Sequence, residues 1–128
     1  MPILVDPHGG GPLNPLLVPD SERKAENDTA QDLTVVTMSS REASDVLMLG
    51  MGAYTPLSGF MNEADWHNVC VHMRMTGGLF WPIPITLSCD TATADGIEIG
   101  ERIALSDPDN GEILATLDVS EKYIPDKK

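Results

Sequence analysis

Basic residues are scarce in this sequence. Lys and Arg number eight against twenty Asp and Glu, so the formal net charge is −12 at pH 7 with His neutral. Nucleic-acid binding depends on several Lys or Arg side chains gathered over phosphates. Only the last few lysines lie close together along the chain, which disfavours a nucleic-acid partner. Solubility or adaptation to salt accounts for the acidity.

Cysteines and long apolar runs are also scarce. Cys70 and Cys89 are the only cysteines, and they cannot complete a four-ligand zinc site by themselves. We expect reduced, packed thiols in a cytoplasmic protein. No apolar run approaches the ~20 residues of a membrane span. The N-terminus lacks the basic and apolar regions of a signal peptide, so the sequence predicts no membrane partner.

Aromatic residues are few, and all but Tyr123 lie between Gly50 and Leu87. Aromatic side chains bury the most area per residue, so the core should form where they sit. Two Gly- and Pro-rich stretches, 50–61 and 80–84, are predicted to be ordered corners with special backbone conformations.

Helix signals occur on both sides of the first corner. Ser39 followed by Glu42 is a capping box, and it predicts a helix that ends near Gly50. This helix is expected to bury a face made by Val46, Leu47 and Leu49. Asn62 is expected to cap a second helix that ends at Gly77–Gly78, with a buried stripe of Trp66, Val69, Cys70 and Met73.

Short strands are predicted at 3–5, 33–38, 85–89, 102–106 and 113–119 from their β-branched or alternating patterns. The stretch 107–111 contains Pro108 and ends in Asn-Gly, which predicts a hairpin turn. Residues 20–32 are predicted to be an exposed loop or a weak helix, and residues 91–100 a loop or a short helical turn. The fold class is therefore α+β: one domain, 1–128, with two adjacent helices in a small, mostly antiparallel and partly closed barrel.

The residues give no catalytic constellation. His8 precedes three glycines, but no phosphate-loop Lys follows, so a structural turn explains the stretch better. His67 and His72 point about 140° apart on the predicted helix and cannot chelate one metal. No activating base stands beside Ser58. The sequence therefore predicts no catalytic, cofactor-binding or metal-binding residue.

Two long motifs carry a resemblance to a known family. They are the run from Gly52 to Met61, GAYTPLSGFM, and the run from Trp81 to Leu87, WPIPITL. Pro7–Gly10, Arg41-Glu42 and the closing Tyr123-x-Pro-Asp-Lys add to it. In this order they resemble the N-terminal domain of ATP sulfurylase (sulfate adenylyltransferase), over nearly the whole chain.

The resemblance implies a PUA-like β-barrel with helices that serves as a scaffold. It places the ATP- and sulfate-handling motifs in a following α/β domain that these 128 residues do not contain, so the chain alone is expected to be inactive. The full enzyme would make adenylyl sulfate and pyrophosphate from ATP and sulfate, or run the reverse reaction in sulfur oxidation. It would use ATP with magnesium. The implied partners are the catalytic domain of the same enzyme and, in the full enzyme, further copies of it. The alternative is a stand-alone PUA-like module that binds RNA or protein, which fold alone does not decide.

A domain of a larger enzyme should expose the surface that its neighbour covers. The two corners are rich in aromatic residues, Pro and Met, which interfaces favour. We therefore expect side chains at these corners to remain at the surface as an interdomain patch, namely Tyr54, Leu57, Met61 and Trp81.

Overall fold

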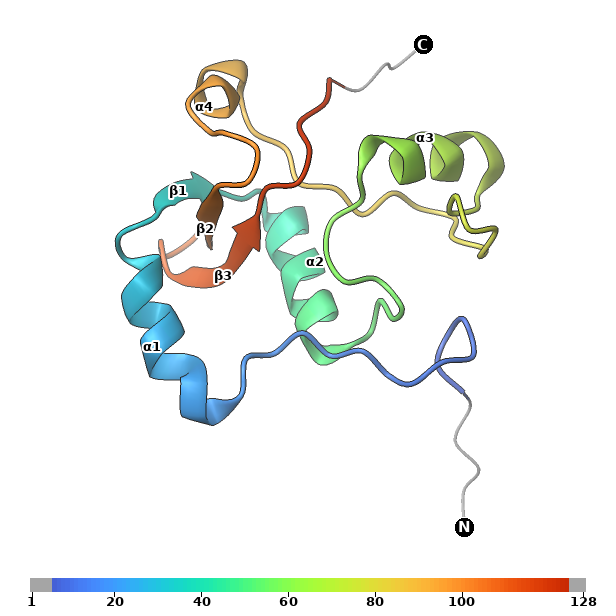
Figure 1. The fold of residues 1–128 in the computed structure, drawn as a ribbon, viewed down its shortest axis with the longest axis horizontal. Coiled ribbons are helices and arrows are strands. Elements are labelled where there is room, and N and C mark those ends of the chain that lie inside the picture. Colours follow the sequence, from blue (N-terminus) through green and yellow to red (C-terminus); the bar gives the residue numbers. More distant parts are fainter. Residues whose placement is uncertain (1–5, 125–128) are drawn as a thin grey trace.

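The computed structural model describes residues 6–124, so the predicted strand at 3–5 lies outside the described residues. A three-stranded sheet and a central helix, α2 (Ser40–Met51), form one side of the domain. Helix α3 (Glu63–His72) and the two corners form the other side (Figure 1). Within the described residues, no helix combines the length and hydrophobicity needed to cross a membrane.

The sheet has the order β1-β2-β3 and is mixed. Strand β1 (Thr34–Thr37) runs parallel to β2 (Arg102–Ser106), with Val36 opposite Leu105. Strand β3 (Ile113–Asp118) pairs with β2 in antiparallel fashion through the predicted hairpin, in which the Asp107 N–H donates to the Glu112 carbonyl at 2.8 Å. The α+β class is confirmed. The predicted barrel is wrong, because the sheet is open, and the mostly antiparallel arrangement is only partly right.

The missing strand at 85–89 explains why the sheet stays open. Pro82 and Pro84 have no N–H to donate to a ladder. Further along, the Ser88 N–H donates to the Glu42 carboxylate at 2.6 Å, and the Ile85 carbonyl accepts from Met61 at 2.8 Å. The segment therefore bonds to a side chain and to the first corner, and it adds no strand to the sheet.

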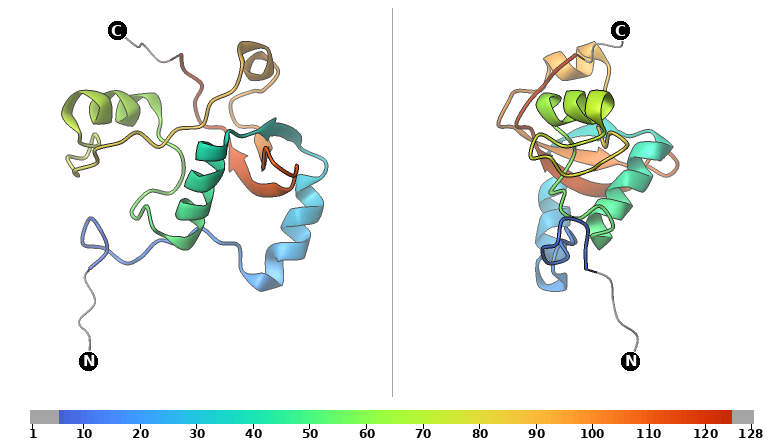
Figure 2. Two further views of the ribbon diagram at one scale, coloured as in Figure 1. Left: turned by 180° about the vertical axis from the view of Figure 1, so that it is seen from behind. Right: turned by 90° about the vertical axis from the view of Figure 1, so that its right-hand side faces the viewer.

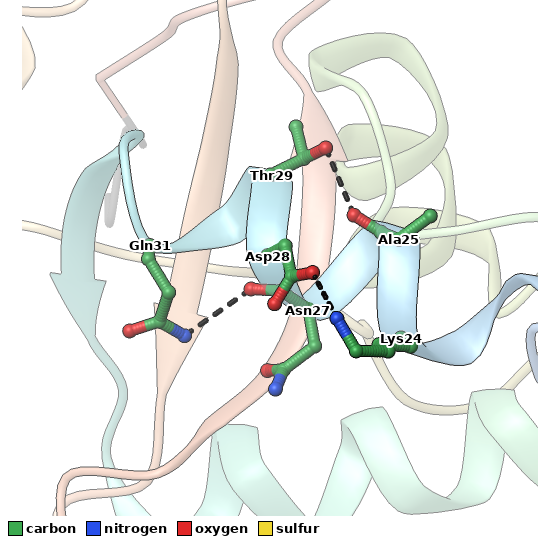
Figure 3. A network of polar contacts seen from close by, with 6 residues as sticks. All are labelled: Lys24, Ala25, Asn27, Asp28, Thr29 and Gln31. Carbon is green, nitrogen blue, oxygen red and sulfur yellow. Dashed lines mark hydrogen bonds and ion pairs between the residues drawn. The ribbon is translucent and has the colours of Figure 1, made fainter.

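Helix α1 (Asp20–Ala30) occupies the stretch predicted to be a loop or a weak helix. Its Pro19 N-cap supplies no side-chain hydrogen bond, and Ala30 is its only buried residue. One ion pair within the helix supports it instead (Figure 3): the Lys24 ammonium lies 2.9 Å from the Asp28 carboxylate. Such an exposed pair adds a few tenths of a kcal/mol. The Thr29 hydroxyl donates to the Ala25 carbonyl at 3.0 Å, a bond to the preceding turn that does not stabilise a helix. Helix α1 is therefore marginal and lies at the rim of the domain.

Both predicted caps are present. The Ser39 hydroxyl accepts from the Glu42 N–H at 3.2 Å, and the Glu42 carboxylate accepts from the Ser39 N–H at 2.8 Å. Asn62 accepts from the Asp65 N–H at 2.8 Å and begins α3. Local side-chain chemistry therefore determines where both helices start.

The predicted buried faces are only partly correct. In α2 the inward residues are Glu42, Ala43, Asp45 and Leu49, whereas Leu47 is exposed. In α3 only Val69 is buried, whereas Trp66 is half-buried and Cys70 is exposed. Met73 lies outside the helix, which already ends at His72. Met73 follows it in the left-handed conformation, and Gly77–Gly78 belong to a separate turn closed by the Gly78 N–H on the Met75 carbonyl at 2.8 Å. A fourth helix, α4 (Thr91–Asp95), is the predicted helical turn.

Two hydrophobic clusters fill the interior. The first lies between the sheet and α2 and contains Val36, Met38, Ala43, Ile97, Ile103, Leu105 and Val119. The second joins the corners to α2 and α3 and contains Leu49, Leu57, Met61, Val69, Trp81 and Ile85. The core expected at the aromatic-rich stretch is therefore the second cluster, and the first is built without a buried aromatic residue.

Candidate interdomain surface

Three of the four predicted surface residues are core residues. Leu57 and Met61 are each 6% exposed and Trp81 is 7% exposed. The expectation that they remain at the surface is wrong. With six aromatic residues in the chain, the corners supply the bulk that the second cluster needs. Whether these corners contact a neighbouring domain stays a prediction.

Tyr54 is half-buried, and its side chain packs against the second cluster. Its ring meets Trp81 edge-on, with centroids 5.9 Å apart, and its hydroxyl donates to the Asp45 carboxylate at 3.0 Å. Burial raises the pKa of Tyr54, and the bond to Asp45 and the charge of that carboxylate raise it further. Tyr54 is thus a neutral hydrogen-bond donor that ties the corner to α2.

The N-terminal strap, residues 6–19, runs across the corners toward α1 (Figures 1 and 2). His8 Nε2 donates to the Phe80 carbonyl at 2.7 Å, and the His8 ring lies 5.6 Å from that of Trp81. The Gly10 N–H bonds the Pro7 carbonyl at 2.9 Å, which confirms the turn predicted at His8. His8 therefore fastens the strap to the second corner.

The strap is also fastened to the first corner. Asn14 donates from its backbone to the Thr55 hydroxyl at 2.9 Å and from its amide side chain to the Leu57 carbonyl at 3.2 Å. Leu16 and Leu17 both donate to the Gly50 carbonyl, at 3.0 and 3.2 Å. The corners are therefore covered by the chain's own N-terminal residues, so other side chains of this region form its outer surface.

The outer surface of this region combines exposed apolar side chains with few charges. Residues 7–19, 46–62 and 66–89, which we call the uncharged lobe, contain Arg74 as their one Lys, Arg, Asp or Glu. The first turn of α3, between the last two of these ranges, adds Glu63 and Asp65. Of the fourteen large hydrophobic residues exposed among the described residues, eleven belong to this lobe. Charged residues are depleted at the centres of protein interfaces, so the uncharged lobe is the better candidate for an interdomain surface.

The other end of the molecule is strongly acidic. Residues 90–121, which include α4, β2 and β3, hold nine Asp and Glu against the single Arg102. The Arg102 guanidinium lies 3.0 Å from the Asp118 carboxylate and 3.8 Å from that of Glu26. The remaining carboxylates have no such partner among the described residues, and solvation of this end is its simplest role.

A groove of about 270 Å³ separates the two ends, and Trp66, Leu87, Cys89 and Tyr123 help to line it. Its basic residue, Lys122, already donates to the Ala94 and Ile97 carbonyls at 3.0 and 2.7 Å. Cys70 and Cys89 are both exposed, so the expectation of packed thiols is wrong. Partial desolvation and the nearby charges of Asp90 and Glu42 raise the pKa of the Cys89 thiol, which keeps it a weak nucleophile. The groove thus offers neither a free cation nor an activated thiol.

Glu42 has a second role that the sequence did not reveal. Its carboxylate accepts from the Ser88 N–H and hydroxyl, at 2.6 and 2.8 Å, in addition to capping α2. Burial alone would raise the pKa of Glu42, but the bonds from Ser39 and Ser88 outweigh it and hold the pKa below its ordinary value. The capping box predicted the contact with Ser39, whereas no local signal marks a partner 46 residues away. This carboxylate is a structural clamp.

The structure brings no predicted chemical group into a reactive arrangement. His67 and His72 are exposed on α3. Within residues 6–124, no three His, Cys, Asp or Glu residues gather closely enough to hold a metal ion.

Comparison with known proteins identifies the family. The family model for a PUA-like domain matches residues 5–128. A sulfate adenylyltransferase from Syntrophobacter fumaroxidans is 55% identical over 126 residues, which cover 98% of this chain and 31% of that enzyme. One from Thiobacillus denitrificans is 50% identical over 97% of this chain and 30% of the enzyme. The solved structure of a hexameric APS kinase from Thiobacillus denitrificans superposes with a TM-score of 0.81 at 38% identity, over 95% of this chain and 24% of the other.

The chain thus spans less than a third of the length of these curated relatives. The alignment with the Syntrophobacter fumaroxidans enzyme covers 98% of this chain, which includes both corners and helices α2 and α3. The chain belongs to the PUA-like domain family, in the form that makes up about 30% of its sulfate adenylyltransferase relatives.

Proposed function

We propose that this chain is the N-terminal, non-catalytic scaffold domain of a sulfate adenylyltransferase, the enzyme that joins sulfate to ATP and releases pyrophosphate. The observation that carries the proposal is the match to sulfate adenylyltransferases over 97–98% of this chain but only 30–31% of theirs. A domain in that position contributes to the folding and assembly of a larger enzyme.

The charge distribution supports this division of labour. ATP, sulfate and pyrophosphate are anions, and their reaction needs positive charge and preorganised donors. The chain has a formal charge of −12, and two of its basic residues, Arg102 and Lys122, are committed to Asp118 and to backbone carbonyls. The proposed domain therefore binds no nucleotide or metal, and ATP with magnesium belongs to the catalytic domain.

The partners follow from the same proposal. The first is the catalytic domain of the same enzyme, and the second is a further copy of the full enzyme, since the structural relative named above is hexameric. A cytoplasmic location is part of the proposal, as expected for an enzyme that uses ATP.

An activity assay tests the proposal. The purified 128-residue chain, shown by its circular dichroism to unfold cooperatively, should release no pyrophosphate from ATP, sulfate and magnesium. The Syntrophobacter fumaroxidans enzyme provides the positive control under the same conditions. Turnover by the chain that survives repurification would contradict the assignment of a non-catalytic role.

A further inference from the structure

One patch of the uncharged lobe is continuous and entirely apolar. Leu47, Met48 and Met51 are exposed on the last turns of α2, and their spacing places them side by side on the helix surface. Leu13 and Leu17 of the N-terminal strap are exposed beside them. We call these five residues the α2 patch.

Two glycines at the end of α2 let the strap approach the helix closely, because they carry no side chain. A Cβ at Gly50 would lie 3.5 Å from Leu17 Cδ2, and a Cβ at Gly52 would lie 3.1 Å from both Leu13 Cγ and the Pro15 nitrogen. Gly52 also has φ = +83°, a conformation that favours glycine. The strap therefore packs directly on the helix end, and the leucines extend the apolar surface of α2.

From these observations we infer that the α2 patch is the docking site for the rest of the enzyme polypeptide, which covers it with an apolar, uncharged surface. The inference rests on the proposed function and specifies where that scaffold binds its neighbour. The stretches that contain the patch, 7–19 and 46–62, have no Lys, Arg, Asp or Glu. About 70% of each relative lies outside the matched region, so a large neighbour is available to cover it.

Covalent linkage favours this occupant over a second copy of the chain. A neighbour on the same polypeptide is present at an effective concentration of about 1 mM or more, well above the concentration of free protein in most preparations. The other exposed apolar side chains of the lobe, Val71, Met73, Phe80 and Ile83, include the chain neighbour of Arg74, Met73, and its bridge partner, Phe80. The α2 patch is therefore the part of the lobe best suited to a dry interface.

The test uses a chimera in which this chain replaces the matched region of the Syntrophobacter fumaroxidans enzyme. Both native cysteines of this chain are changed to serine, and so are the cysteines of the remainder. Then Met51→Cys is compared with Ile99→Cys. The two native side chains are similarly exposed, 58% and 63%, and Ile99 lies in the acidic end. The rate of modification by a maleimide is measured for each variant, natively and in denaturant.

We expect the native Met51→Cys chimera to react at least about tenfold more slowly than the Ile99→Cys chimera, and the two to react equally when unfolded. Equal native rates would overturn the inference. Protection that disappears on dilution would also overturn it, because a second copy would then be the occupant. Pyrophosphate release by the chimera without either new cysteine separates the docking site from the proposed function. If this chimera is active and the Met51→Cys site reacts rapidly, only the docking site is overturned. If this chimera is inactive, the result counts against the proposed function.

Discussion

Replacing Glu42 with Ala should be among the most damaging single changes in this domain. The side chain is 2% exposed and accepts three hydrogen bonds from two segments, at Ser39 and Ser88. A hydrogen bond to a charged group contributes about 1.5–3 kcal/mol, and loss of a helix cap costs about 1 kcal/mol. Ser39 and Ser88 are exposed, so water replaces part of what is lost. We therefore expect Glu42→Ala to lower the free energy of unfolding by about 2–4 kcal/mol.

The assay is urea denaturation followed by circular dichroism and by the fluorescence of the two tryptophans. Glu22→Ala is the matched control, because Glu22 also lies in the first turn of a helix and is exposed. That control should stay within about 0.5 kcal/mol of the parent. If the midpoint of Glu42→Ala coincided with that of Glu22→Ala, the clamp would be energetically irrelevant and this reasoning would fail.

The same carboxylate predicts a pH dependence with a definite sign. The pKa of Glu42 is held below its ordinary value of 4.5 in the folded state, so the unfolded state binds more protons in this range. The contribution to stability is complete above that ordinary value and is lost as the pH falls through the folded-state pKa. Glu42→Gln should therefore flatten the loss of stability below pH 4.5 relative to the parent. An unchanged profile would show that other carboxylates carry it.

Three further predictions concern packing and partners. Trp81→Ala should lower the free energy of unfolding by about 3–5 kcal/mol, because the Trp81 ring is buried in the second cluster. Trp66→Ala should lower it by about 1–3 kcal/mol, because the Trp66 ring is half-buried against Tyr123. Equal costs in urea denaturation would contradict this order. Gly52→Ala should cost at least about 1–2 kcal/mol from its positive φ, and a parent-like melting temperature would contradict this expectation. Fluorescence titration at physiological salt should detect no RNA binding, and a micromolar, salt-dependent complex would support an RNA-binding module.

Local chemistry made parts of the fold predictable. The Ser39–Glu42 box, the Asn62 cap and the Asn110-Gly111 turn each involve residues within a few positions of one another, so their effect can be derived from the sequence. The parallel pairing of β1 with β2 could not be derived, because Thr34 and Ile103 are far apart in the sequence. The hydrogen bond from Ser88 to Glu42 could not be derived either, because it joins distant segments.

Three of the four residues predicted for the candidate surface are buried, so the sequence did not identify which side chains lie outside. Composition indicated that the corners carry apolar bulk, yet it contains no information on which side of a corner faces inward. Packing decided that Leu57, Met61 and Trp81 fill the second cluster. The distribution of charge along the sequence was the more useful signal, since the uncharged stretches carry most of the exposed apolar side chains.

Pyrophosphate release by the chimera, compared with that of the unmodified Syntrophobacter fumaroxidans enzyme and of the isolated chain, tests the central claim most directly. If this chain is a scaffold domain that supplies no catalytic group, the chimera should retain kcat within about tenfold of the unmodified enzyme, a difference of about 1.4 kcal/mol in the activation barrier. The isolated, folded chain should be inactive. A folded chimera without activity, or turnover by the isolated chain, would contradict the account.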